Sequence, residues 1–74
     1  MAKINGFPVH ATITLDRVIV GVDQHNRFLD DVGFCLACGA EADGCEPDAE
    51  RYRCEACDAP QVYGAEQLLI YLSV

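Results

Sequence analysis

Residues 34–58 read FCLACGAEADGCEPDAERYRCEACD, and all five cysteines of the 74-residue chain lie within them. Four of them form two C-x-x-C pairs, Cys35 with Cys38 and Cys54 with Cys57, with fifteen residues between the pairs. Two pairs at this spacing are typical of a metal site, because each pair turns back on itself and presents two sulfur atoms to one point. The sequence therefore predicts that the four thiolates bind one ion, and it favours zinc.

Thiol redox chemistry is the main alternative to metal binding. A redox C-x-x-C opens a helix in a βαβ unit, whereas neither pair here opens a predicted helix. Iron also stays open as the metal, since four cysteine ligands alone do not separate iron from zinc. Cys45 lies outside both pairs, and we expect it to be a small core or surface residue. His10 and His25 lack ligand spacing to a cysteine, so we expect both to be ordinary polar residues.

A four-cysteine site has no open coordination position, so we expect its metal to be structural. A single domain of this size buries only about 60% of the surface of its unfolded chain, which leaves a marginal core. Structural zinc contributes roughly 10–16 kcal/mol of apparent binding free energy, which is large on that scale. Gly39 and Asp58 follow the two pairs, and both residue types tolerate the positive φ in which such turns tend to end.

The predicted fold is small α+β: a zinc ribbon of three short antiparallel strands around the site, flanked by an N-terminal and a C-terminal helix. We divide the single domain into an arm or edge strand (1–13), a helical segment (14–32), the ribbon (33–63) and the C-terminal helix (64–74). Within the ribbon, we expect AEADGCE (40–46) to pair with RYR (51–53) across a turn at Pro47-Asp48. Residues 61–63 are the expected third strand.

The N-terminal segment carries a turn signal at Asn5-Gly6, followed by Pro8. Residues 9–13 alternate as a strand does, and the proline favours an edge strand or an extended arm.

Apolar residues then repeat with helical spacing, and Thr14 is a suitable N-cap. This stripe consists of Leu15, Val18, Ile19 and Val22. A β-branched run at 18–20 and Gly21 oppose a helix, so a strand over 17–22 stays open. A second stripe consists of Ala65, Leu68, Leu69 and Leu72. We expect the two stripes to pack together; the alternative is an exposed stripe that forms a dimer or partner surface.

Twelve acidic and five basic residues give a net charge of −7, which argues against direct binding to nucleic acid. Ser73 is the single serine, and the chain has no glycine-rich phosphate loop and no H-E-x-x-H motif, so we expect no enzyme. The apolar runs are too short to span a membrane, and no signal-peptide pattern opens the chain. We therefore expect a cytoplasmic protein.

The segment from Gly33 onward resembles a group of small zinc-ribbon proteins of bacteria and their phages. The shared pattern is G-F-C-x-x-C-G-A-E, then E-P-D-A, then Y-x-C-x-x-C-G, then V-Y-G-A-E-x-L-L. This chain matches it at residues 33–41, 46–49, 52–57, 62–66 and 68–69. It departs at Asp58, where the pattern has glycine, and at Cys45, where an aliphatic residue is common. The resemblance implies the fold and the metal, but no biochemical role.

Together these features predict a non-enzymatic, zinc-stabilised protein-interaction module, in the setting of a bacterial or phage accessory protein. The partner is expected to be a protein, and the chain to be a monomer or a small homo-oligomer. The alternative is an acidic decoy, encoded by a phage, that occupies a nucleic-acid-binding site of a host defence or transcription complex. Salt separates the two, because a decoy complex weakens sharply with salt and an apolar interface does not.

Overall fold

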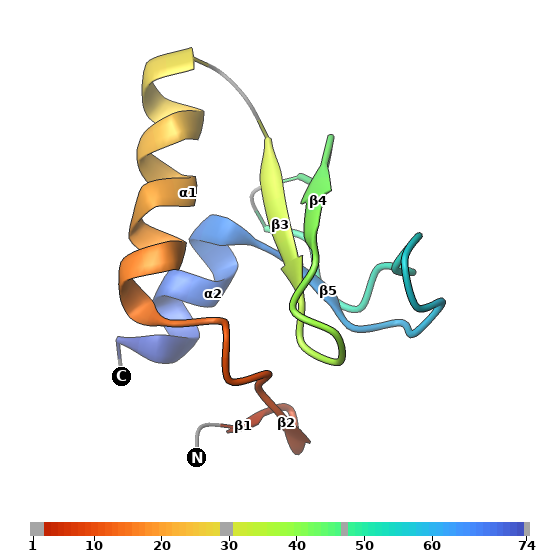
Figure 1. Cartoon of the computed structure of the whole chain (residues 1–74). Coiled ribbons are helices and arrows are strands. Elements are labelled where there is room, and N and C mark those ends of the chain that lie inside the picture. The colour runs from red at the N-terminus through yellow and green to blue at the C-terminus, as the bar shows by residue number, and fades with distance from the viewer. Residues whose placement is uncertain (1–2, 29–30, 47, 74) are drawn as a thin grey trace.

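A computed structural model describes residues 3–28, 31–46 and 48–73 of the chain. The described residues form an α+β fold with two helices and two small antiparallel sheets (Figure 1). In chain order the elements are β1 (Lys3–Ile4), β2 (Phe7–Pro8), α1 (Leu15–Phe28), β3 (Val32–Cys35), β4 (Glu41–Asp43), β5 (Val62–Gly64) and α2 (Ala65–Leu72).

The N-terminal turn signal forms a hairpin. Asn5 and Gly6 both have positive φ, 51° and 81°, and they join β1 to β2. Two consecutive positive φ values are typical of a type I′ turn, which matches the twist of the flanking strands. Of the two alternatives for residues 9–13, an edge strand and an extended arm, the strand is wrong: these residues are turn and irregular structure. Val9 and Ile13 are nevertheless buried, because alternation also suits a chain that only lies on the core.

The helix predicted from residue 14 is confirmed as α1, so the strand alternative over 17–22 is wrong. The Thr14 side chain accepts a hydrogen bond from the Arg17 N–H at 3.2 Å, as an N-cap should. The expected helical segment ran to residue 32, but Val32 already belongs to β3. Residues 29 and 30, between the two elements, lie outside the described residues.

Each C-x-x-C pair forms the loop of its own short hairpin. The first loop joins β3 to β4, with Phe34 opposite Glu41 and Gly33 opposite Ala42. The second loop joins Tyr52 to β5, where Tyr52 and Val62 exchange both backbone hydrogen bonds. The strand order is β4-β3-β5 in the three-stranded sheet.

The predicted pairing of residues 40–46 with 51–53 is therefore wrong. The turn after Cys38 sends the chain straight back along β3, so β4 finds its partner before the second pair is reached. At the expected Pro47-Asp48 turn, the Ala49 N–H donates to the Glu46 carbonyl at 3.0 Å. Pro47 itself lies outside the described residues.

The two faces of this sheet build two separate cores. Side chains alternate across a strand, so Phe34 and Tyr63 face the helices while Cys35 and Val62 face the opposite side. The helix-side core also takes in Ile4, Val9, Ile13, Val18, Leu36, Ala65 and Leu68. The other core consists of Cys35, Cys45, Ala49, Cys54 and Val62. The sheet thus holds the cysteines apart from the helical packing.

Helices α1 and α2 pack against each other, as the stripes predict (Figure 1). The contact is narrower than expected: Val18 is fully buried, whereas Leu15 and Ile19 are 42% and 46% exposed. Gly21 explains why the buried face of α1 differs from the predicted stripe. A Cβ built on Gly21 would lie 3.2 Å from the Ala65 Cβ and 3.2 Å from the Phe34 ring, so α1 faces its neighbours at this residue. The glycine that argued against a helix is the point at which α1 approaches its neighbours. No helix in the described ranges is long and apolar enough to cross a membrane.

Candidate metal centre

The four predicted ligands lie in two matching turns. The Cys35 N–H donates to the Ala40 carbonyl, and the Cys35 carbonyl accepts from the Gly39 N–H, at 3.0 and 2.8 Å. Cys54 makes the same two bonds, to the Ala59 carbonyl and from the Asp58 N–H, both at 2.8 Å. Each turn therefore folds back on itself and brings its two sulfur atoms to the shared cluster.

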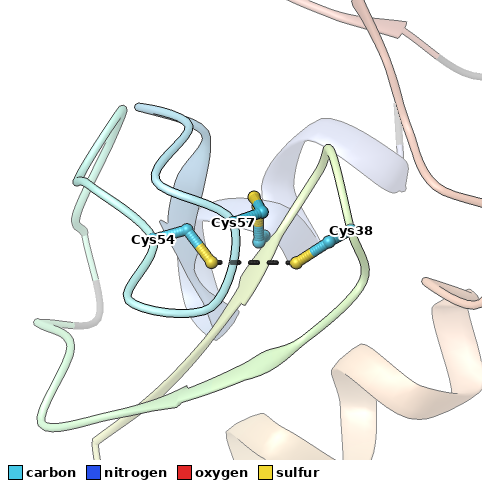
Figure 2. Close-up of side chains that lie close together, drawn as sticks. Cys38, Cys54 and Cys57 are labelled. Carbon is cyan, nitrogen blue, oxygen red and sulfur yellow. Dashed lines mark hydrogen bonds between the residues drawn. The ribbon is translucent and has the colours of Figure 1, made fainter.

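The two turns bring their sulfur atoms together. The Cys35 and Cys57 Sγ atoms are 3.6 Å apart, and those of Cys38 and Cys54 are 3.7 Å apart. Figure 2 shows the sulfur atoms of Cys38 and Cys54 pointing toward each other across the space between the turns. All four Sγ atoms lie within 4.8 Å of one another.

This spacing fits one tetrahedral metal ion. With a metal–sulfur distance of about 2.3 Å, the sulfur atoms of a tetrahedral site lie about 3.8 Å apart. A disulfide would require about 2.05 Å, far less than the observed separations. Neither pair opens a helix, since α2 begins only at Ala65, which removes the structural setting of a redox C-x-x-C. The four cysteines are close enough to bind one metal ion, as the sequence predicts.

The environments of the sulfur atoms differ between the turns. Cys35 and Cys54 are buried, Cys38 is half-buried and Cys57 is exposed. Burial raises the pKa of the Cys35 thiol to about 12. The backbone N–H groups of Cys57 and Ala56 lower the pKa of the Cys54 thiol to about 7. Cys54 therefore gives up its proton more readily than Cys35, which stays a thiol at neutral pH until a cation displaces its proton.

Cys45 is not part of this cluster. Its side chain is buried against Gly33, where an added Cβ would lie 2.7 Å from the Cys45 sulfur. Burial and the negative charges of Asp31 and Glu46 raise the pKa of its thiol. A buried thiol of raised pKa is chemically inert. Of the two predicted roles, a small core residue or a surface residue, Cys45 has the first.

His10 lies near the first turn but does not join the sulfur cluster. Its ring Nδ1 is 2.8 Å from the Thr12 Oγ1, and its backbone N–H donates to the Leu36 carbonyl at 2.9 Å. His25 belongs to α1, and its side chain lies outside the described residues.

Arg17 supports the first turn, a role that the sequence did not indicate. Its Nη1 donates to the Gly39 carbonyl at 2.8 Å, and its guanidinium lies 4.7 Å from the centre of the Phe34 ring. The first turn is thereby tied to α1. The helical spacing indicates only that Arg17 lies beside the apolar face of its helix. It does not predict the contact with the Gly39 carbonyl, which is far away in the sequence.

Comparisons with protein-family models, with curated proteins and with solved structures each gave no match to this chain. The resemblance to small zinc-ribbon proteins of bacteria and phages stays a prediction.

Proposed function

We propose that this chain is a non-enzymatic zinc-ribbon module whose role is to bind another protein. The observation that carries the metal assignment is the convergence of four Sγ atoms within 4.8 Å from two turns of the same geometry. Zinc is the favoured ion because four thiolates in a tetrahedron suit its preferred coordination, and bound zinc would supply a cross-link between the two hairpins. Zinc content measured after purification without added metal tests this assignment.

A structural role for the metal follows from the ligand set. Four protein ligands leave no coordination position for water or substrate. Apart from the thiols and the Tyr63 hydroxyl, no polar or charged side chain is buried among those that the structure describes, so their carboxylates and the Lys3 amine lie at the surface. Both features favour a binding module over an enzyme. We propose a cytoplasmic setting for this module.

The surface supports a protein partner. Large apolar side chains on both helices are 42–59% exposed: Leu15, Ile19, Val20 and Ile70. The net charge of −7 opposes contact with a phosphate backbone. The same charge supports the second candidate, an acidic decoy for the nucleic-acid-binding site of a host complex, in the setting of a phage accessory protein.

The experiment is affinity capture from a lysate of the source cell, at low and high salt, with the zinc-loaded chain as bait. A zinc-free chain with Cys54→Ser and Cys57→Ser is the control. A protein captured only by the zinc-loaded chain supports the interaction module. Capture that disappears at high salt favours the decoy, because salt screens exposed charges. Equal capture by both baits would overturn the zinc-dependent module.

A further inference from the structure

A hollow of about 380 Å³ lies between β4 and the second C-x-x-C turn. Residues 40–45 line one side and residues 52–56 line the other, together with Val62. The space remains open because small residues line it: Ala40, Ala42, Gly44 and Ala56. The hollow therefore admits a side chain from outside the molecule.

The hollow borders the free edge of the sheet. In the order β4-β3-β5, β4 is an outer strand, and no strand of the described residues pairs with its far side (Figure 1). An outer strand offers unpaired backbone N–H and C=O groups to an extended chain. The side chains of β4 alternate between the two faces of the sheet. Ala42 packs with the buried cysteines, while Glu41 and Asp43 lie on the opposite face and are exposed.

The rim of the hollow carries unbalanced negative charge. The side chains of Glu41, Asp43 and Glu55 form no hydrogen bond or ion pair within the part of the chain that the structure describes. Arg53 also lines the hollow, but its guanidinium is paired with the Asp58 carboxylate. An incoming segment therefore meets carboxylates whose charge is not compensated locally.

We propose that β4 binds an extended segment of a partner protein as an added strand, and that this segment reads basic–apolar–basic. Residues opposite each other on neighbouring strands share a face. The two basic residues would lie opposite Glu41 and Asp43, and the apolar residue between them would lie opposite Ala42 and enter the hollow. This inference rests on the proposed function, since it names the surface and the partner chemistry of the same module.

The test uses the zinc-loaded full chain and a short capped peptide with Arg-Val-Arg at its centre. Affinity is measured by fluorescence anisotropy, and the site by amide chemical shifts. Four changed peptides probe the three contacts: Glu-Val-Glu, Arg-Asp-Arg, and two Arg-Val-Arg peptides in which one or the other set of alternate backbone amides is N-methylated. We expect the first two to lose binding. Of the two N-methylated peptides, we expect only one to lose binding, because only one set of amides faces β4.

The matched protein variants are Glu41→Gln with Asp43→Asn, and Asp16→Asn with Glu66→Gln. Each pair removes two negative charges from a chain of net charge −7, but only the first pair lies at the hollow. We expect the first pair to weaken peptide binding about tenfold and the second less than about twofold. Shifts should be confined to β4 and the lining of the hollow.

Absence of binding, equal weakening by the two variant pairs, or shifts elsewhere on the molecule would overturn the β4 site. Its failure is distinct from failure of the proposed function. If the peptide does not bind while the zinc-loaded chain still captures a protein that the zinc-free chain does not, the module stands and this site is wrong.

Discussion

Gly39 and Asp58 adopt the same left-handed backbone conformation, with φ of 77° and 69°, at the same position of the two C-x-x-C turns. Their surroundings differ. A Cβ built on Gly39 would overlap the Thr12 Oγ1 and lie 2.8 Å from the His10 Nδ1. Asp58 is exposed, and its carboxylate contacts Arg53. The covered turn requires glycine, and the open turn tolerates a side chain.

This difference predicts opposite outcomes for two substitutions. Gly39→Ala should destabilise the zinc-loaded protein by about 2–4 kcal/mol, because it adds both backbone strain and overlap with the segment that covers the turn. Asp58→Gly should change stability by less than about 1 kcal/mol, since relief of strain offsets the loss of an exposed ion pair. Thermal unfolding of both variants measures this. Equal costs would mean that the N-terminal segment does not cover the first turn.

The position of Gly21 predicts that a substitution favoured by helix propensity will destabilise the protein. Gly21→Ala should gain up to about 1 kcal/mol as a better helix former. It should lose more from overpacking, about 1–3 kcal/mol, because Ala65 and the buried Phe34 ring have little room to move. Val20→Ala on the same helix, at a 58% exposed site, should keep or slightly raise stability. Chemical unfolding of the two variants decides whether packing or propensity dominates at Gly21.

The sequence predicted the features that depend on local chemistry. The cysteine spacing identified the sulfur cluster, Thr14 marked the helix start, and Gly39 and Asp58 indicated the two turns. Strand pairing was not predictable in the same way. Residues 40–46 carry no signal that distinguishes β3 from residues 51–53 as partner, and only the tight turn after Cys38 decides it. The buried face of α1 was misjudged because Gly21 has no apolar side chain to reveal a contact.

The sulfur cluster predicts one equivalent of zinc per chain and four essential ligands. Serine at Cys35, Cys38, Cys54 or Cys57 should release the metal and unfold the two hairpins, because structural zinc supplies much of their stability. Cys45→Ala should retain the metal and cost only about 1 kcal/mol for the buried sulfur that is lost. Elemental analysis and circular dichroism measure the outcome. Loss of zinc from Cys45→Ala would make Cys45 a ligand.

Zinc affinity should rise with pH. A metal ligand must be a thiolate, and at neutral pH the Cys35 thiol still holds its proton because burial raises its pKa to about 12. Cys54, with a pKa of about 7, becomes protonated as the pH falls below neutrality. The apparent affinity should therefore fall by about one decade or more per pH unit between about pH 8 and 6. Competition with a chelator of known pH dependence measures this, and an affinity independent of pH would contradict proton displacement.

The separation of the two cores predicts that the helices can be loosened without loss of the metal. Leu68 is fully buried in the helix-side core, whereas the sulfur cluster lies on the opposite face of the sheet. Leu68→Ala should cost about 2–5 kcal/mol, and Leu69→Ala, at a half-buried site, about 1–2 kcal/mol. Ile70→Ala on the same helix is the control: its side chain is 59% exposed, so its removal should cost less than about 0.5 kcal/mol.

Unfolding by denaturant, zinc content and mass in solution are measured together for these three α2 variants. All three should remain folded at low temperature with one zinc, because the ligands are held by their own turns and by the core on the other face of the sheet. Zinc release from Leu68→Ala would show that the two cores are coupled through β5, where Tyr63 and Val62 point to opposite faces. Equal costs for Leu68→Ala and Ile70→Ala would instead mean that Leu68 is not core. The face of α2 that contacts α1 would then become the first candidate for partner binding.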